Sequence, residues 1–147
     1  MSASLYDTDF YAWANEQAAL LRAGKLSAAD IEHIAEEIES MGRGEKRELV
    51  SRLRVLLHHL LKWQHQPSRR GNSWRLSIAN ARDELETHLR DNPSLKAKLG
   101  EAVSDAYRLA RRDAAAETGL PESAFPTECP YETAHMMDEA FWPGEMA

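Results

Sequence analysis

The sequence predicts an all-α protein: an up-and-down helical bundle of about five helices with an irregular, proline-rich C-terminal tail. Apolar residues recur every three or four positions along most of the chain, the spacing that gives a helix one apolar side. Glycine and proline divide this pattern into pieces of helical length, and no stretch alternates like a β-strand. With 147 residues, we expect one helical domain over residues 1–147, with the main bundle at about 8–119 and a wrapping tail at about 120–147.

The longest apolar helix is expected between Glu45 and Gln66. Its apolar face is broad, which is typical of a central bundle helix that several neighbours cover. The side chains on this face are Leu49, Val50, Leu53, Leu56, Leu57, Leu60, Leu61 and Trp63. Pro67 should end the helix, and Asn72 or Ser73 can cap the next helix near Trp74. The result is a predicted helical hairpin.

Two shorter helices are expected before this hairpin. Residues 8–23 form the first, with Asp7 or Thr8 as its cap. The second begins at Ser27, where Asp30 three residues later resembles a capping box. Its apolar stripe is Ile31, Ile34, Ile38 and Met41.

The segment Gly42-Arg43-Gly44 is expected to separate the second helix from the central one. Each glycine costs about 1 kcal/mol relative to alanine inside a helix. The alternative is a single long kinked helix from Ser27 to Gln66.

Two further helices and the tail follow the turn at Pro67. Apolar residues from Trp74 to Leu89 predict the fourth helix, and Asn92 with Pro93 should open the fifth, which Gly119 ends. The tail contains four prolines, and one short helix from about Tyr131 to Phe141 is expected in it. Its expected anchors on the bundle are Phe125, Tyr131, Met137, Phe141 and Trp142.

The net charge of −6 conceals a separation of charge along the chain. Residues 1–42 carry two basic and eight acidic groups, residues 43–75 nine basic and two acidic groups, and residues 76–147 seven basic and fourteen acidic groups. One interpretation is that acidic helices pack beside the basic hairpin, so that the charges compensate within the fold. The other is a basic face that binds an acidic partner.

Composition also indicates the cellular compartment in which the protein is expected. Cys129 is the only cysteine, which excludes an internal disulfide and fits a reducing compartment. No apolar run reaches the roughly 18 residues of a membrane span, and the acidic N-terminus lacks the pattern of a signal peptide. We therefore expect a cytoplasmic protein without membrane partners.

Several stretches, taken together, resemble one known family. They are YDTDFYAWANEQAALLRAG, EHIAEEIESMG, LLHHLLKWQHQPSRRGNSWR, NPSLKAKL and ETGLPESAFPTECPYETAHMMDEAFWP. The chain resembles the bacterial domain-of-unknown-function family twenty-nine from Tyr6 to Pro143, and the segment at residues 60–74 is quite specific to that family. This resemblance implies an all-helical domain and no established activity, and it supplies no catalytic residues.

Catalytic and metal chemistry have little support in the pattern. A di-metal bundle site needs two inward Glu-x-x-His units, and the sequence has none; Asp30-x-x-His33 is the nearest arrangement. A mononuclear site from His58 or His65 with Glu36 and His88 is conceivable but matches no motif. No phosphate loop or nucleophile motif is present, so we expect no cofactor, no catalytic residue and no metal ligand. Whether the protein is an enzyme stays open, and the sequence favours a protein that is not one.

The basic hairpin gives a second hypothesis, binding of single-stranded RNA. Basic groups can follow phosphates while aromatic rings stack on unpaired bases. A basic stripe could form from Arg43, Lys46, Arg47, Arg52 and Arg54, and the candidate interaction surface is Lys62, Trp63, Arg69, Arg70, Trp74 and Arg75. The competing interpretation is that both tryptophans belong to the core and that Arg70 or Arg75 stacks on them.

The leading hypothesis is a protein-interaction or adaptor module that could also self-associate. It rests on a compact helical domain without a catalytic motif and on the acidic and basic surfaces that a partner protein could use. The expected partners are therefore a protein or a second copy of the chain, with nucleic acid as the alternative.

Overall fold

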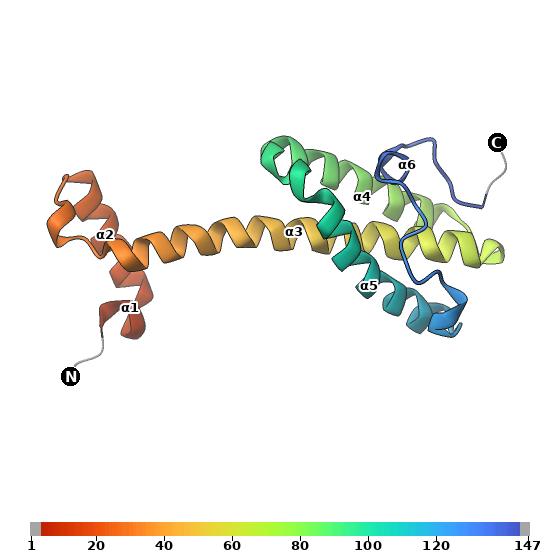
Figure 1. Cartoon of the computed structure of the whole chain (residues 1–147), viewed down its shortest axis with the longest axis horizontal. Coiled ribbons are helices and arrows are strands. Elements are labelled where there is room, and N and C mark those ends of the chain that lie inside the picture. The colour runs from red at the N-terminus through yellow and green to blue at the C-terminus, as the bar shows by residue number, and fades with distance from the viewer. Residues whose placement is uncertain (1–3, 145–147) are drawn as a thin grey trace. The chain divides into compact units, whose positions relative to one another are not determined.

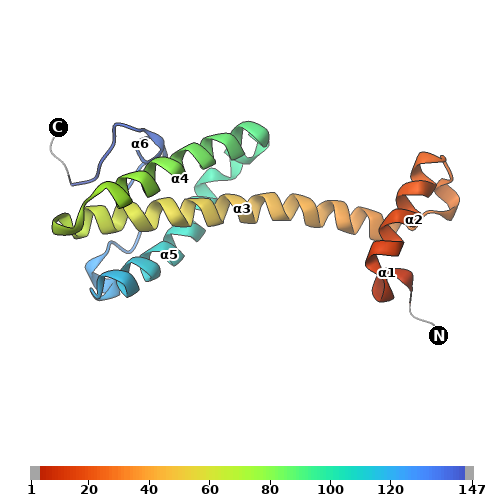
Figure 2. The ribbon, with the colours of Figure 1, turned by 180° about the vertical axis from the view of Figure 1, so that it is seen from behind.

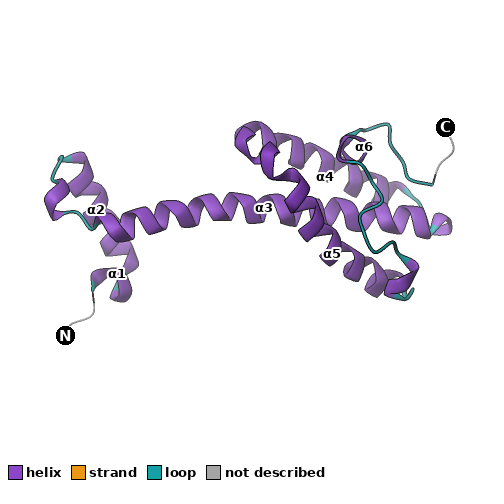
Figure 3. Ribbon diagram, in the orientation of Figure 1, coloured by secondary structure: helices purple, strands orange, loops and turns teal. Residues whose placement is uncertain are grey.

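The computed structural model describes residues 4–144, and these residues form helices and loops without a strand (Figures 1 and 3). The all-α prediction is therefore confirmed. Residue contacts divide the chain into two compact units, Met1–Gly44 and Glu45–Ala147, called here the N-terminal unit and the C-terminal unit. The expectation of one domain over 1–147 stays a prediction, and its ends, residues 1–3 and 145–147, lie outside the described residues.

The N-terminal unit contains α1 (Leu5–Thr8), α2 (Phe10–Arg22), the 3₁₀ turn η1 (Leu26–Ala28) and the first part of α3 (Ile31–His65). Asp9 caps α2, because its side chain accepts a hydrogen bond from the Ala12 amide at 3.1 Å. The caps predicted at Asp7 and Thr8 are therefore wrong.

The start of the second predicted helix also needs correction. Ser27 lies in η1, and α3 begins only at Ile31. Asp30 supplies the cap, since its carboxylate accepts a hydrogen bond from the His33 amide at 3.3 Å. Asp30 thus acts as the capping residue itself and not as the third residue of a box begun at Ser27.

The predicted break at Gly42-Arg43-Gly44 is wrong. Helix α3 runs through this segment without interruption, 35 residues from Ile31 to His65, so one long helix forms as in the alternative, with the bounds 31–65 in place of Ser27–Gln66. Glycine only lowers the propensity for a helix, by about 1 kcal/mol each. It does not forbid helical backbone angles, and both glycines lie within α3. Four long helices (α2 to α5) therefore replace the expected five among residues 4–144.

In the C-terminal unit, the second part of α3 lies between α4 (Asn72–Asp91) and α5 (Leu99–Thr118), as both views show (Figures 1 and 2). The hairpin turn is the predicted one, with Pro67 opening the 3₁₀ turn η2 (Pro67–Arg69). Gly71 occupies the N-cap of α4 without a side-chain hydrogen bond, so the predicted caps at Asn72 and Ser73 are wrong.

The last long helix begins later and ends where the sequence predicts. Pro93 opens the 3₁₀ turn η3 (Pro93–Lys98), and α5 starts only at Leu99. Gly119 ends α5 with φ of 75°, a left-handed conformation that glycine adopts without a steric penalty.

The core of the C-terminal unit is one apolar cluster shared by α3, α4, α5 and the tail. Its buried members are Leu49, Leu53, Leu56, Leu57, Leu60, Leu61, Trp63, Ile78, Ala81, Leu85, Leu89, Ala102, Val103, Ala106, Tyr107, Ala110, Ala114, Phe125, Tyr131 and Met136. Six leucines of α3 are fully buried. The broad apolar face of the central helix is therefore covered by several neighbours, as its sequence predicts.

The tail packs on this bundle through the expected anchors. It contains η4 (Glu122–Ala124) and α6 (Thr133–Met137), which is shorter than the predicted helix over 131–141. Phe125 and Tyr131 are buried, and the other three anchors are partly buried against the core. Arg82 on α4 holds the tail, because its guanidinium donates to the carbonyl oxygens of Met136 and Phe141 at 2.8 and 2.7 Å.

Candidate functional site

The structure divides the predicted interaction surface into a buried and an exposed part. Trp63 is 0% exposed and Lys62 is 7% exposed, so neither belongs to a surface. The Trp63 ring packs against Trp142 of the tail, with 4.7 Å between ring centroids. The Lys62 ammonium lies 5.0 Å from the centroid of the half-buried Trp74 ring. Both tryptophans thus help to close the hairpin, as the core interpretation predicts.

The three arginines of this set have different roles. Arg70 and Arg75 each place a guanidinium 5.2 Å from the centroid of the Trp63 ring, a distance at which a cation is attracted to an aromatic face. Arg70 also donates to the Trp63 carbonyl at 2.7 Å, so it is part of the turn. Arg69 and Arg75 are exposed, and their role in binding stays a prediction.

A ladder of polar contacts joins α3 to α5. Arg54 makes two hydrogen bonds to Asp113, at 2.5 and 2.8 Å. Two turns further on, Lys62 Nζ lies 2.6 Å from Glu117 Oε2. The α3 members of the ladder (Arg54, His58 and Lys62) are spaced by four residues and so share one side of the helix. This arrangement was missed in the sequence, although the four-residue spacing on α3 and between Asp113 and Glu117 is visible there.

These contacts shift the pKa values of the ionisable groups in the ladder. The Lys62 ammonium lowers the pKa of Glu117, and the Arg54 guanidinium lowers the pKa of Asp113. His58 Nε2 lies 3.1 Å from Glu117 Oε2 but is not aligned for a hydrogen bond. Burial outweighs the nearby carboxylate and lowers the pKa of His58, which favours the neutral imidazole.

Other basic residues of the predicted stripe are also paired. Lys46 lies 2.8 Å from Glu101 and Arg52 lies 2.7 Å from Glu84. With the ladder, these pairs support compensation of charge within the fold. The proposed phosphate-binding stripe is largely occupied by carboxylates, and single-stranded RNA binding gains no support.

The histidines proposed as metal ligands have separate neighbours. His88 Nε2 lies 2.9 Å from the Glu45 carbonyl oxygen, and the His65 ring packs edge-on against Phe125 at 4.7 Å. Glu36 belongs to the N-terminal unit. Among residues 4–144, no three side chains of His, Cys, Asp and Glu come together as a metal site would require.

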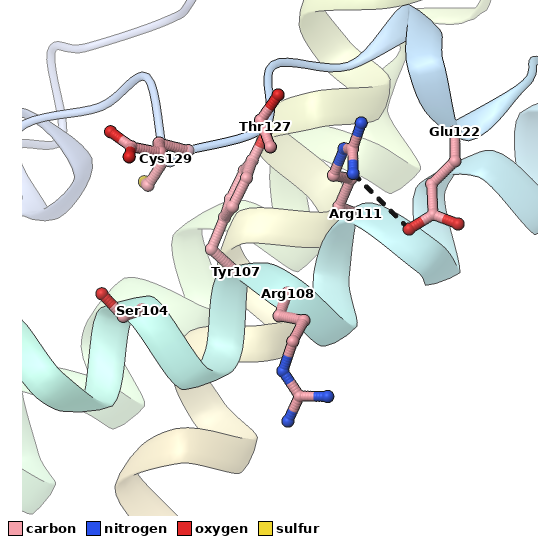
Figure 4. A pocket seen from close by; sticks show the side chains of 8 residues that line it. Ser104, Tyr107, Arg108, Arg111, Glu122, Thr127 and Cys129 are labelled. Atoms are coloured by element: carbon pink, nitrogen blue, oxygen red, sulfur yellow. Dashed lines mark ion pairs between the residues drawn. The ribbon is translucent and has the colours of Figure 1, made fainter.

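A cavity of about 620 Å³ lies between α5 and the tail segment 122–129. Its size suits a small ligand, and Figure 4 shows its lining side chains. The Tyr107 hydroxyl donates to the Pro126 carbonyl at 2.5 Å, and Arg111 faces Glu122 at 3.7 Å. Burial raises the pKa of the Cys129 thiol, which disfavours the thiolate that nucleophilic chemistry needs. These groups hold the tail to α5 and form no reactive set.

In the N-terminal unit, Asp30 is the centre of a polar cluster. Its carboxylate accepts a hydrogen bond from Trp13 Nε1 at 3.1 Å and lies 2.7 Å from His33 Nδ1. Its amide donates to Gln17 Oε1 at 2.6 Å. The contact with His33 lowers the pKa of Asp30, and the carboxylate raises the pKa of His33. The cluster fixes α2 against the start of α3.

Tyr6 adds α1 to this cluster. Its ring stacks on His33, with 3.9 Å between ring centroids, and its hydroxyl donates to Glu37. The bond to Glu37 raises the pKa of Tyr6 to about 12. The side of α3 that carries His33 and Glu37 is therefore occupied by α1 and α2.

The neighbouring side of α3 is apolar and exposed. Ile31 is 53% exposed, Ile38 59% and Met41 66%, while Ile34 is half-buried. Ten large apolar side chains are exposed among the described residues, and eight of them belong to the N-terminal unit: Leu5, Phe10, Tyr11, Leu21, Leu26, Ile31, Ile38 and Met41. The other two are Val55 and Leu76. We call Ile31, Ile34, Ile38 and Met41 the apolar seam.

The fold and its surface define a class: an all-α protein with one well-packed unit and one unit that exposes an apolar helix side. The chain belongs to the family described as "Domain of unknown function DUF29", whose model matches residues 5–142. Comparison with curated proteins and with solved structures gives no match. Among residues 4–144, none of the helices has both the length and the hydropathy needed to cross a bilayer.

Proposed function

We propose that this protein is a protein-interaction module and that the N-terminal unit carries its docking surface. The observation behind this proposal is the uneven distribution of exposed apolar side chains, eight of ten in the N-terminal unit. Four apolar side chains of this unit, those of the apolar seam, share one side of α3, and contiguous apolar surface on a protein commonly marks a site of interaction.

Burial of the apolar seam by a partner would contribute a substantial binding free energy for so small a surface. Complete burial of an isoleucine or methionine side chain contributes about 1.5–3 kcal/mol. Covering the exposed halves of Ile31, Ile38 and Met41 would therefore contribute on the order of 3 kcal/mol in total. Leu5 and Phe10 on α1 and α2 offer further apolar area in the same unit.

The charge of the unit favours a protein partner over a membrane. Helices that bind the membrane surface carry lysine and arginine on their polar side, which attract anionic lipids. Residues 1–42 instead carry eight acidic and two basic groups, and Glu32, Glu36 and Glu39 lie exposed on α3. Repulsion from anionic headgroups would oppose membrane binding.

Site-specific photo-crosslinking in cells that express the full chain tests this proposal. A benzophenone amino acid replaces Ile38 in one variant and Leu76 in a matched control, since both side chains are exposed, at 59% and 62%. We expect a protein adduct from position 38 and none from position 76. Absence of an adduct at position 38, or equal yields at both positions, would contradict the proposal.

A further inference from the structure

We propose that the partner of the apolar seam is a second copy of this chain. This inference rests on the proposed function and names the occupant of the same face. It follows from the spacing of the seam, from the residues that flank it and from the position of the charges on α3.

The seam has the spacing of a short coiled coil. Ile31 and Ile38 are seven residues apart, and so are Ile34 and Met41, each three residues further on. These are the a and d positions of two successive heptads. Since two-fold symmetry brings the same patch of each copy together, such a seam is complementary to itself.

The open flank of the seam permits close approach of another helix. Ala35 and Gly42 lie on this flank, and both are exposed. The other flank contains Glu37, whose carboxylate already accepts the Tyr6 hydroxyl. A second α3 can therefore approach from the Ala35 side without displacing α1 or α2.

The positions of the acidic groups favour a second copy over a basic helix. A helix advances by about 100° per residue, which places Glu32, Glu36 and Glu39 away from the seam, on the back of α3. Basic partners of coiled coils are selected by charges at the positions that flank the seam. Here those positions hold Ala35, Gly42, Gly44 and the engaged Glu37, so the seam offers apolar complementarity and little charge selection.

The area is that of a small, reversible interface. A stable interface buries about 800 Å² on each partner, which is more than the four side chains of the seam offer, three of them exposed and Ile34 half-buried. We therefore expect dimers that form and dissociate with concentration.

Salt should strengthen this dimer. Each copy brings an excess of six acidic groups in residues 1–42, and repulsion between the copies is screened as ionic strength rises. Binding of a basic partner would show the opposite dependence on salt, because screening then weakens attraction.

Sedimentation velocity of the full chain over a range of concentrations tests the inference. The wild-type chain should shift from the monomer toward the dimer as concentration rises, and the shift should begin at lower concentration in high salt. The double variant Ile31→Glu/Ile38→Glu should raise the dimer Kd by at least about tenfold, because it places carboxylates in an apolar interface. The control Val55→Glu/Leu76→Glu, which changes exposed side chains of the C-terminal unit, should dimerise like the wild type.

Two results would overturn the inference: a wild-type monomer at every concentration, or a dimer that the Ile31→Glu/Ile38→Glu variant retains. Failure of this inference is distinguishable from failure of the proposed function. A monomeric chain that still gives a crosslinked adduct of another mass at position 38 overturns only the second copy as partner. A monomeric chain without any adduct overturns both.

Discussion

The two units use similar helical patterns to opposite effect. In the C-terminal unit, the leucine face of α3 is covered by α4, α5 and the tail, and six leucines are fully buried. In the N-terminal unit, the apolar seam of the same helix is largely exposed. The periodicity of apolar residues predicts that a helix has an apolar side. Whether that side becomes core or interface depends on whether the chain supplies enough neighbouring helices.

The polar side chains of the two units also differ in burial, and those of the N-terminal unit are again the more exposed. Asp30 and His33, in the N-terminal unit, are about one-third exposed. Lys62 and His58, in the ladder of the C-terminal unit, are about one-tenth exposed. Desolvation therefore lowers the pKa of His58, whereas the Asp30 carboxylate raises the pKa of His33. The polar groups of the C-terminal unit are therefore the more deeply buried ones.

The largest effect should come from a matched pair of truncations on α3. Leu56→Ala removes a fully buried side chain and should lower the free energy of unfolding by about 2–5 kcal/mol, through lost burial and a residual cavity. Ile38→Ala, at an exposed position of the seam, should change it by less than about 0.5 kcal/mol in dilute monomer. Urea denaturation measures both. Equal losses in the two variants would break the comparison between the units.

Removal of the hydrogen bonds from Arg82 to the tail should cause the next largest loss of stability. Arg82→Lys cannot reproduce the hydrogen bonds to the carbonyls of Met136 and Phe141. Leaving a buried carbonyl without its donor should cost about 1–3 kcal/mol. Limited proteolysis should then cleave the tail faster. Arg90→Lys is the control, since Arg90 is two-thirds exposed, and equal cleavage of the two variants would rule out this role for Arg82.

A smaller loss of stability is expected when the ion pair between Lys62 and Glu117 in the ladder is removed. Glu117→Gln leaves the Lys62 ammonium without its carboxylate, and this should cost about 1 kcal/mol, because Glu117 itself is half exposed and the pair is partly screened. Glu86→Gln, at an exposed pair with Arg90, should have almost no effect. Thermal denaturation compares the variants. Adding Lys62→Met to Glu117→Gln should recover part of the loss, and a further loss would show that the charge pair is not the cause.

The smallest effect is a pH response of opposite sign in the two units. The raised pKa of His33 gives stability that is present below the unfolded pKa of about 6.5 and lost as pH rises through the folded value. The lowered pKa values of His58, His59 and His65, all caused first by burial, give stability that is lost as pH falls below about 6.5. NMR titration should place the His33 midpoint above the other three, and the reverse order would contradict the assignment.

Much of the C-terminal unit could be predicted from local signals. Pro67 and Gly119 mark chain reversals because proline and glycine restrict or extend the backbone angles directly. Trp63 was expected in the core under one of two interpretations and Phe125 as an anchor of the tail on the bundle, and both are buried. Such signals depend on a few adjacent residues and need no knowledge of the tertiary fold.

The candidate surface could not be predicted in the same way. The stripe Ile31, Ile34, Ile38 and Met41 is visible in the sequence, but its exposure depends on where α1 and α2 pack, which is set by long-range contacts such as Tyr6 with His33. The continuity of α3 through Gly42 was only the alternative, because the weak preference of glycine against helix was given more weight than the helical pattern on either side. Local pattern thus gives the element and its apolar side, and not what covers that side.

Hydrogen exchange of the full chain in dilute solution tests most directly whether the two units differ as described. We expect amides of α4, α5 and residues 49–63 of α3 to exchange only through global unfolding, while amides of residues 10–38 exchange through local openings of much lower free energy. Protection of residues 10–38 equal to that of the C-terminal unit in dilute monomer would show that the N-terminal unit needs no partner, and would contradict the account.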